Sequence, residues 1–270
     1  MPGALGVERG DVAAMDVPAA ELLAAVHEHG LLVLRNQRLT PSGLVELASR
    51  LGEPEIYPFA EPLAESPYVV AVVKNPEDRS NFGGAWHTDT SYLPQPPGLT
   101  LLYGVDIPAS GGDTLYADMR AAYEALSPGL RRILDGLVAR NSAAMVHSGS
   151  GTYAAVAGQS VRLRESTMAT EADHPVVRVH PVTGRRALFL SLIHTAHFKD
   201  MTREESLPLI TYLQEFAVRA ERCTRLCWQP GTLAIWDNRS VQHYPLNDYH
   251  GQRREMHRVI LKGETPRGPG

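Results

Sequence analysis

Residues 228–244 read WQPGTLAIWDNRSVQHY. The run LAIW is short and apolar, which predicts a buried strand, and the polar residues DNRS that follow it predict a turn. Two further short strand-like runs flank this stretch, TRLCWQ at 224–229 and REMHRVILKG at 254–263. Because such strands do not alternate regularly with helices, the pattern argues against a doubly wound parallel sheet. It favours a mainly β protein, an antiparallel sandwich or barrel with flanking helices.

Helical patterns surround the strands. Apolar residues recur at helical spacing in residues 18–30, 40–53, 120–141 (with a break at Ser127–Pro128) and 202–220. The chain has 270 residues, of which 43% are hydrophobic, so a single domain over residues 1–270 can bury a large core. Residues 145–175 are polar and weakly patterned, which makes them a candidate lid, and residues 264–270 are expected to be disordered.

The charge balance excludes several classes of partner. The formal net charge is −4 with 21% charged residues, so no basic excess points to nucleic acid or to a membrane surface. No apolar run approaches the roughly 20 residues that span a bilayer. The N-terminal residues lack the basic start and apolar core of a signal peptide. We therefore expect a cytoplasmic protein with a small-molecule partner, for which a homo-oligomer remains compatible with the sequence.

The stretch AWHTDTSY at 85–92 places two ionisable residues in strand-like surroundings. Residues i and i+2 of a strand point to the same face, so His87 and Asp89 are predicted to project side by side. An imidazole and a carboxylate in that arrangement can bind one metal ion. A hydrogen-bonded pair in the core is the competing interpretation when the two residues are considered alone.

A third ligand is expected from elsewhere in the chain. Among the 11 histidines, His243 differs because it follows a buried strand and its turn, in a region dense in Asn, Asp and Arg. Two histidines and one carboxylate on one face of a metal, with open positions opposite, are typical of non-haem Fe(II) oxygenases. Zinc can use the same ligand types, but the helical HExxH signature that often supplies them is absent.

An oxygenase of this kind needs electrons. If 2-oxoglutarate supplies them, its keto-acid end chelates the iron and its far carboxylate needs a buried cation. Arginine is suited to this task because its planar fork pairs both carboxylate oxygens and it stays protonated. A strand running back beside the metal-bearing strand would carry Arg254 to this place. Arg258 has the same parity on that strand and would face the same way.

Five motifs together resemble the taurine/2,4-D dioxygenase family (TauD/TfdA-like), whose members are Fe(II)- and 2-oxoglutarate-dependent enzymes. The resemblance runs in order from about residue 20 to residue 263, nearly the whole chain. HxD alone is a weak signal, but the ordered set is highly specific. The motifs are WHTD (86–89), GGDT (111–114), HPVVRVHPVTGRRALF (174–189), WQPGTLAIWDNRSVQHY (228–244) and NDYHGQRREMHR (247–258).

The resemblance implies a fold and a set of roles. The fold would be a double-stranded β-helix, the cupin-like jelly roll. The iron ligands, which are also the catalytic residues, would be His87, Asp89 and His243. Thr114 and Arg254 would bind the far carboxylate of 2-oxoglutarate, and Trp236 would pack beside the site. Arg258 would lie near the substrate or the chelating carboxylate.

Some of these residues have simpler explanations. Thr114 could merely close the turn formed by SGG, and Arg258 could belong to a structural salt bridge. His147 falls where the family often places pocket residues, so it is a candidate for substrate binding. His194 and His197 are interpreted as structural.

The pocket is expected to differ from that of enzymes that use sulfonates. Those members of the family bind the sulfonate with a His, a Tyr and an Asn, and the places correspond here to Tyr57, Ala60 and Gly83. Two of the three lack a hydrogen-bonding side chain, so taurine is expected to be a poor substrate. Tyr57, Phe59 and Phe82 suggest a larger, more apolar substrate with one acidic group near Arg258. An intermediate of secondary metabolism, an alkyl sulfate or an aryloxy acid would fit.

The predicted reaction is oxidation of a substrate C–H bond by Fe(II), 2-oxoglutarate and O2, with release of succinate and CO2. Hydroxylation is the default outcome, while desaturation, ring formation and cleavage would use the same residues. Two alternatives stay open. One is a non-catalytic sensor that binds metal and 2-oxoglutarate on the same fold, and the other is a zinc-dependent hydrolase.

Overall fold

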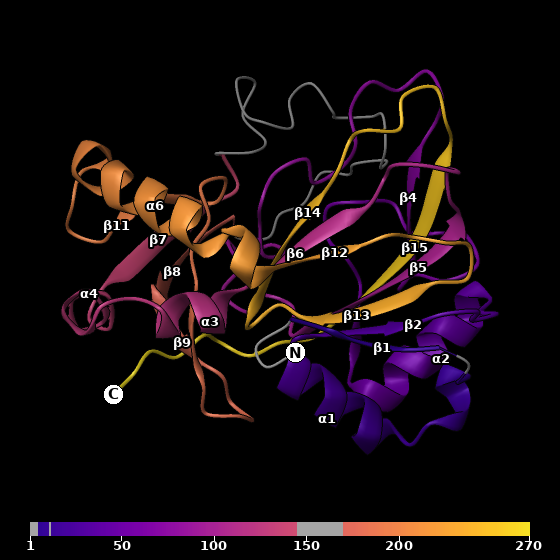
Figure 1. The fold of residues 1–270 in the computed structure, drawn as a ribbon, viewed down its shortest axis with the longest axis horizontal. Helices are drawn as coiled ribbons and strands as arrows, with labels where there is room; N and C mark the ends of the chain where they lie inside the picture. Colours follow the sequence, from indigo (N-terminus) through magenta and orange to yellow (C-terminus); the bar gives the residue numbers. More distant parts are fainter. Residues whose placement is uncertain (1–4, 11, 145–169) are drawn as a thin grey trace.

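The computed structural model describes residues 5–10, 12–144 and 170–270, and its framework is two β-sheets that face each other (Figure 1). The larger sheet has the strand order β1-β2-β13-β5-β15-β3, with β4 also paired to β15. Its strands are β1 (Val7–Arg9), β2 (Leu31–Leu34), β3 (Pro54–Glu55), β4 (Val70–Lys74), β5 (Leu99–Asp106), β13 (Leu233–Asp237) and β15 (Arg254–Leu261). The smaller sheet has the order β12-β6-β14, from β6 (Thr114–Asp118), β12 (Cys223–Leu226) and β14 (Val241–Pro245).

The outer face of the larger sheet is covered by α1 (Ala19–His29) and α2 (Pro41–Leu51), which lie below β1 and β2 in Figure 1. Leu99 and Leu101 of β5 pack in one core cluster with the apolar faces of these helices. Because strand residues alternate between faces, the intervening Thr100 and Leu102 point to the other side, toward the space between the two sheets. This alternation gives the larger sheet one apolar outer face and one mixed inner face.

The helix ends follow the predicted signals. Gly30 ends α1 in the left-handed conformation with φ 75°, and its N–H donates to Val26 O at 2.7 Å. Thr40 caps α2 by accepting from Gly43 N, with Pro41 at the first helical position. The fold class predicted from the sequence, mainly β with flanking helices and a jelly-roll core, is confirmed.

A second group of elements lies beside the two sheets, at the left of Figure 1. It shares one hydrophobic cluster, in which Phe198 and Leu213 are fully buried. Its helices are α3 (Met119–Glu124), α4 (Pro128–Leu134) and α6 (Arg203–Ala217). Its strands are β7 (Val138–Ser142), β8 (Glu171–Pro175), β9 (Val177–Val179), β10 (Arg186–Leu188) and β11 (Thr195–Phe198). Short 3-10 helices occupy Ala14–Asp16 and Ala220–Arg222.

The predicted helix over 120–141 is only partly right. Ser127 caps α4 and separates it from α3, as the Ser-Pro break predicts. Residues 138–141, however, belong to β7 and not to a helix. β7 pairs with β8 on one edge and with β11 on the other, so tertiary pairing overrides the local helical pattern.

Two further expectations need correction. Residues 171–175 of the candidate lid form β8, while residues 145–169 lie outside the described residues. The expected disorder of residues 264–270 is wrong. Arg267 O accepts from Val179 N at 2.8 Å, and Glu264 pairs with the buried side chain of Arg178. A composition rich in Gly and Pro predicted disorder, but these contacts give the segment a fixed place.

No helix in the described part of the chain is both long enough and apolar enough to cross a membrane.

Candidate active site

His87 and His243 lie next to each other because their backbones pair. His87 N donates to His243 O at 3.1 Å and His243 N donates to His87 O at 2.9 Å. The centroids of the two rings are 4.2 Å apart. His87 Nδ1 lies 2.7 Å from Ala85 O, which has no proton to give, so Nδ1 carries the proton and Nε2 offers a lone pair. His87 Nε2 in turn lies 3.9 Å from Asp89 Oδ1.

Asp89 reaches the histidines by a route that differs from the predicted one. The chain does not continue as a regular strand beyond His87, because Asp89 lies in a turn in which Thr90 has φ 39°. Leu93 N closes this turn on Thr90 O at 2.9 Å. The prediction that His87 and Asp89 share a face of a strand is therefore wrong in its geometry. The turn nevertheless directs both side chains to one point.

The three side chains form a group suited to a metal ion. One nitrogen or oxygen atom of each of His87, Asp89 and His243 lies within 4.8 Å of the others, and all three residues are buried. Burial, the largest effect, lowers the pKa of both histidines. Burial by itself would raise the pKa of Asp89, but the Arg258 charge, the histidines and a hydrogen bond from Thr100 lower it to about 2. The group thus presents two neutral imidazoles and one carboxylate, which are the protonation states that a metal ion requires.

A cavity connects this group to two buried arginines. It encloses about 480 Å³ of empty space, part of it open to solvent. Phe82, Leu102 and Met256 supply apolar parts of its wall. The residues that line it are Val72, Phe82, Gly83, His87, Asp89, Leu102, Thr114, Trp236, His243, Pro245, Arg254, Met256 and Arg258.

Arg254 lies in this cavity with hydrogen-bonding capacity to spare. The residue is 6% exposed, and its Nε and Nη2 have no hydrogen-bond partner among the described residues. Its guanidinium lies 5.7 Å from the ring centroid of Trp228 and 5.9 Å from that of Tyr249. A buried cation with unused donors is costly unless an anion completes it, so this end of the cavity fits a carboxylate.

The strand that carries Arg254 is not where the sequence suggested. β15 pairs with β4 and β5 in the larger sheet, whereas His243 lies on β14 in the smaller one. The two residues therefore face each other across the cavity and do not lie on neighbouring strands. The expected parity is confirmed, because Arg254, Met256 and Arg258 all line the cavity.

Thr114 and Trp236 complete the walls near the histidines. Thr114 is 2% exposed, and its Oγ1 accepts a hydrogen bond from Trp228 Nε1 at 2.9 Å. The ring centroid of Trp236 lies 4.7 Å from that of His243. Both residues line the same cavity as Arg254, which is the neighbourhood that the resemblance implied for them.

Arg258 lies at the other end of the cavity, close to the metal-binding group. Its Nη2 is 3.2 Å from Asp89 Oδ1, and its guanidinium lies 4.7 Å from the ring centroid of Tyr57. Phe82 lines the cavity, while Tyr57 stands behind Arg258 in a buried aromatic group with Phe59 and Tyr92. His147 lies outside the described residues.

A model of a known protein family matches nearly the whole chain. The family model described as "Taurine catabolism dioxygenase TauD, TfdA family" matches residues 1–260. The chain belongs to the TauD/TfdA family. The resemblance inferred from the five motifs is thereby confirmed.

The relatives of this TauD/TfdA protein carry several names. An alpha-ketoglutarate-dependent sulfate ester dioxygenase of Pseudomonas putida is 36% identical, over 98% of this chain and 89% of the relative. A protein named alkylsulfatase, from Acinetobacter baylyi, is 34% identical over 90% of this chain and 76% of its own length. Among solved structures, a putative alpha-ketoglutarate-dependent taurine dioxygenase from Burkholderia xenovorans has a TM-score of 0.83 and 30% identity, covering 100% of this chain and 93% of its own.

A third kind of relative comes from a fungus. An alpha-ketoglutarate-dependent dioxygenase of Penicillium expansum, cnsP, is 32% identical over 97% of this chain and 72% of its own length. Together the comparisons make this TauD/TfdA protein an oxidoreductase, a 2-oxoglutarate-dependent dioxygenase. They favour the dioxygenase over the sensor and the zinc hydrolase that the sequence left open.

Several residues of the site were not singled out from the sequence. Trp228 and Tyr249 flank Arg254, and Thr100 and Asn238 lie behind Asp89. His194, interpreted as structural, has its ring centroid 6.2 Å from that of His87. Trp228, Asn238 and Tyr249 belong to the motifs quoted above, and this is the signal by which the sequence could have identified them. Thr100 lies in an apolar strand, where nothing in the local pattern marks it.

Gly83 bears on the choice of substrate. It lines the cavity with φ 84°, and a Cβ atom there would lie 3.0 Å from His87 Cε1. A larger side chain at this place would be strained and would crowd the ring of His87. Ala60, at the second corresponding place, is fully buried and apolar. Neither residue offers a side-chain donor to a sulfonate.

Proposed function

We propose that the protein is an Fe(II)-dependent oxygenase that uses 2-oxoglutarate and O2 to oxidise a C–H bond of a small anionic substrate, with an alkyl sulfate ester as the leading class. The observation that carries the proposal is the shared cavity. It joins the group of His87, Asp89 and His243 to the buried Arg254, whose Nε and Nη2 have no partner among the described residues.

His87, Asp89 and His243 would bind Fe(II) as two neutral imidazoles and a carboxylate. Arg254 and Thr114 would bind the far carboxylate of 2-oxoglutarate, with Trp236 closing the wall beside His243. When bound, the iron would supply the redox chemistry in which O2 and 2-oxoglutarate give succinate, CO2 and an oxidised substrate. Arg254 and the metal-binding group line one cavity. A 2-oxoglutarate molecule that chelates the metal with one end needs this arrangement, because its far carboxylate must reach Arg254 at the same time.

Arg258 would take the anionic group of the substrate. It is 7% exposed, and its charge would compensate a sulfate within an otherwise largely apolar space formed by residues such as Phe82 and Met256. Tyr57 would support Arg258 from behind, and His147 is retained as a substrate-binding candidate. The names of two relatives, a sulfate ester dioxygenase and an alkylsulfatase, support the sulfate ester class.

The expected products can be written for this class. Insertion of one oxygen atom into the C–H bond next to the ester oxygen converts R–CH2–OSO3⁻ into R–CH(OH)–OSO3⁻. Cleavage of the C–O bond then releases hydrogensulfate and leaves the aldehyde R–CHO. The second oxygen atom enters succinate as 2-oxoglutarate loses CO2. Each succinate is therefore accompanied by one sulfate.

The first experiment tests the metal and co-substrate sites. Protein, Fe(II) and 2-oxoglutarate are mixed without oxygen, and the metal-to-ligand charge-transfer absorbance is recorded. We expect a signal from the native chain and none from His243→Ala. An unchanged spectrum in His243→Ala would contradict the assignment of the metal ligands.

The second experiment tests the substrate class. Succinate, sulfate and aldehyde are measured with linear alkyl sulfates, alkanesulfonates, aryloxy acids and taurine. We expect equal amounts of succinate and sulfate from an alkyl sulfate, and poor turnover of taurine. In Arg258→Gln, succinate formation should no longer be matched by sulfate release. Because Arg258 also contacts Asp89 Oδ1, the anaerobic absorbance of Arg258→Gln is recorded as well, and a retained signal places the loss at the substrate and not at the metal. Oxidation of another class with no sulfate release would replace the sulfate ester by that class.

Further predictions stay with this proposal. We propose one catalytic domain over residues 1–270, a cytoplasmic location, and no nucleic-acid or membrane partner, for which the net charge of −4 is the support. A homo-oligomer is compatible with the sequence, and sedimentation of the purified chain measures it.

A further inference from the structure

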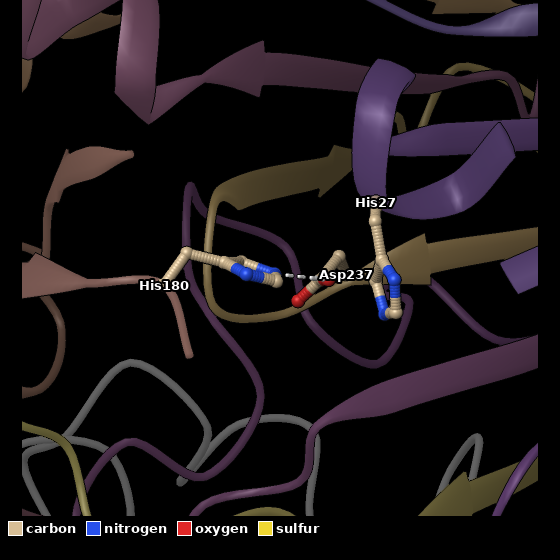
Figure 2. Close-up of side chains that lie close together, drawn as sticks. All are labelled: His27, His180 and Asp237. Carbon is tan, nitrogen blue, oxygen red and sulfur yellow. Dashed lines mark hydrogen bonds and ion pairs between the residues drawn. The ribbon is translucent and has the colours of Figure 1, made fainter. Parts of the chain in front are cut away.

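A second group of two histidines and an aspartate lies outside the cavity and consists of His27, His180 and Asp237 (Figure 2). Its ligand atoms lie within 4.8 Å of one another, as in the first group. His180 Nδ1 accepts from the backbone N–H groups of Val182 and Thr183, each at 3.1 Å. His180 Nε2 therefore carries the proton, which it donates to Asp237 Oδ2 at 2.8 Å.

An arginine completes this group where a metal would otherwise bind. Arg239 donates from Nε to Asp237 Oδ1 at 2.7 Å and from Nη2 to Asp237 Oδ2 at 2.8 Å. Its Nη2 also lies 3.1 Å from His27 Nε2. Because a guanidinium already neutralises the carboxylate, the group is a closed network of protein hydrogen bonds and a poor place for a second cation.

Backbone hydrogen bonds anchor the turn between β13 and β14, which carries Asp237 and Asn238. Asp237 N donates to Gly30 O and Asn238 N donates to Gly98 O, both at 3.0 Å. The turn is thus tied to the end of α1 and to the start of β5. Asp237 faces His180 and Arg239, while the side chain of Asn238 lies on the side of Asp89 and Thr100.

A chain of hydrogen bonds runs from Asn238 to the proposed metal site. Trp236 Nε1 donates to Asn238 Oδ1 at 3.0 Å, and Asn238 Nδ2 donates to Thr100 Oγ1 at 2.8 Å. Thr100 Oγ1 donates to Asp89 Oδ2 at 2.7 Å. Thr100 is fully buried and Asn238 is 1% exposed.

The indole of Trp236 determines which atoms donate and which accept along this series of hydrogen bonds. An indole N–H can only donate, so the oxygen of the Asn238 amide must face Trp236 and its nitrogen must face Thr100. The Thr100 hydroxyl accepts from that nitrogen, and its own proton is then directed to Asp89. Asp89 Oδ2 receives a hydrogen bond, while Oδ1 lies 3.9 Å from His87 Nε2 and 3.2 Å from Arg258 Nη2.

We propose that Thr100 and Asn238 are positioning residues that hold the Asp89 carboxylate with its Oδ1 turned toward the histidines of the proposed metal site. The inference rests on the proposed metal site. Partners of this kind commonly change metal affinity roughly 10- to 100-fold when they are removed, because they pre-orient the ligand. The anchored turn gives the pair a rigid base, and β14, which starts after the same turn, carries His243.

The test compares two substitutions at one place. Thr100→Val keeps the shape of the side chain and removes the hydroxyl, while Thr100→Ser keeps the hydroxyl. The dissociation constant for Co(II) is measured by calorimetry without 2-oxoglutarate, and the melting temperature of the metal-free protein is recorded. We expect Thr100→Val to weaken Co(II) binding roughly 10- to 100-fold and Thr100→Ser to bind as the native chain does. A lower melting temperature with unchanged Co(II) affinity would overturn the proposal.

Two further variants make the outcome decisive. Asn238→Ala, with Thr100 intact, should weaken Co(II) binding in the same direction but less. The double variant with Thr100→Val should be little worse than Thr100→Val alone, because Asn238 acts on the Asp89 carboxylate through Thr100 and its direct contact with Asp89 N is long, at 3.5 Å. Additive losses in the double variant would contradict a shared path. His243→Ala distinguishes an error in the proposed metal site from an error in the positioning role of Thr100. If it binds Co(II) normally, the metal site itself is wrong, and if it loses Co(II) while Thr100→Val does not, only the positioning role fails.

Discussion

At the residue scale, the protein keeps ionisable side chains inside a largely apolar interior. Asp89, Arg254 and Arg258 are each less than a tenth exposed, at 4%, 6% and 7%. Arg258 Nη2 lies 3.2 Å from Asp89 Oδ1, whereas Arg254 has no ion pair among the described residues, and both arginines keep Nε and Nη2 without a hydrogen-bond partner there. Burial lowers the pKa of Arg254, yet a guanidinium stays charged at neutral pH. The unpaired charge is what prepares the site for an anionic co-substrate.

Arg254→Gln should therefore weaken 2-oxoglutarate binding sharply. Losing one partner of a buried charge pair costs about 2–5 kcal/mol, which raises the dissociation constant roughly 30-fold or more. The measurement is a titration of the anaerobic iron complex with 2-oxoglutarate. Arg253→Gln is the matched control, because Arg253 is exposed and pairs with Asp106 and Glu255. Equal effects of the two substitutions would remove the proposed role of Arg254.

At the element scale, the turn before β6 shows why glycine occurs in GGDT. Gly112 has φ 71°, and a Cβ atom there would lie 3.2 Å from Arg254 Cδ and 3.2 Å from Tyr249 Cδ1. The same turn delivers Thr114 to the cavity. The left-handed backbone and the crowding by Arg254 and Tyr249 thus both disfavour a side chain at Gly112.

A comparison of Gly112→Ala with Gly184→Ala separates the cost of the left-handed backbone from the cost of crowding. Gly184 has φ 68° but no neighbouring atom within 4 Å of a Cβ, so its substitution should cost about 1–2 kcal/mol from the left-handed backbone alone. Gly112→Ala should cost more, and it should also weaken 2-oxoglutarate binding by displacing Arg254. Urea unfolding and the anaerobic titration measure the two effects. Equal free energies of unfolding and unchanged 2-oxoglutarate affinity would mean that the turn does not support the arginine.

At the scale of the whole molecule, the Asp237 network links α1, the larger sheet and the C-terminal segment. Arg239 bonds both oxygens of Asp237 and approaches His27, and its Nη1 lies 3.7 Å from Glu264 Oε2. Burial alone would raise the pKa of Asp237, but the His180 hydrogen bond and the Arg239 charge bring it well below its usual value. The ionised carboxylate therefore favours the folded state.

The pH dependence of stability follows from this shift. Since the folded pKa lies below the unfolded value, the contribution is fully present above roughly pH 4 and is lost as the pH falls through the folded pKa. Asp237→Asn should lower the free energy of unfolding at pH 7 by about 3–5 kcal/mol, because it removes the carboxylate that pairs with Arg239 through both oxygens and leaves only the more distant Glu264. Its stability should also fall less steeply on acidification. Urea unfolding between pH 7 and pH 3 checks both, and a slope equal to that of the native chain would contradict the linkage.

The sequence predictions were right where neighbouring residues determine the structure and wrong where residues far along the chain determine it. The helix ends at Gly30 and Thr40 were predicted correctly because their signals are local. Residues 138–141 were assigned to a helix, since the pairing of β7 with β8 and β11 involves strands far along the chain. The disorder expected for residues 264–270 failed for the same reason, because Glu264 is fixed by Arg178, which composition does not reveal.

The sequence by itself determined the residue types of the proposed site and the class of chemistry. Two imidazoles, one carboxylate and a non-titrating cation can be recognised from side chains and order alone, as His87, Asp89, His243 and Arg254 were. Only the tertiary structure decided how they meet. Asp89 arrives from a turn, and β15 faces β14 across the cavity instead of pairing with it. The bonds from Thr100 to Asp89 and from Trp228 to Thr114 also join residues from distant segments. Such contacts depend on which strands the two sheets bring together, and no local periodicity contains that information.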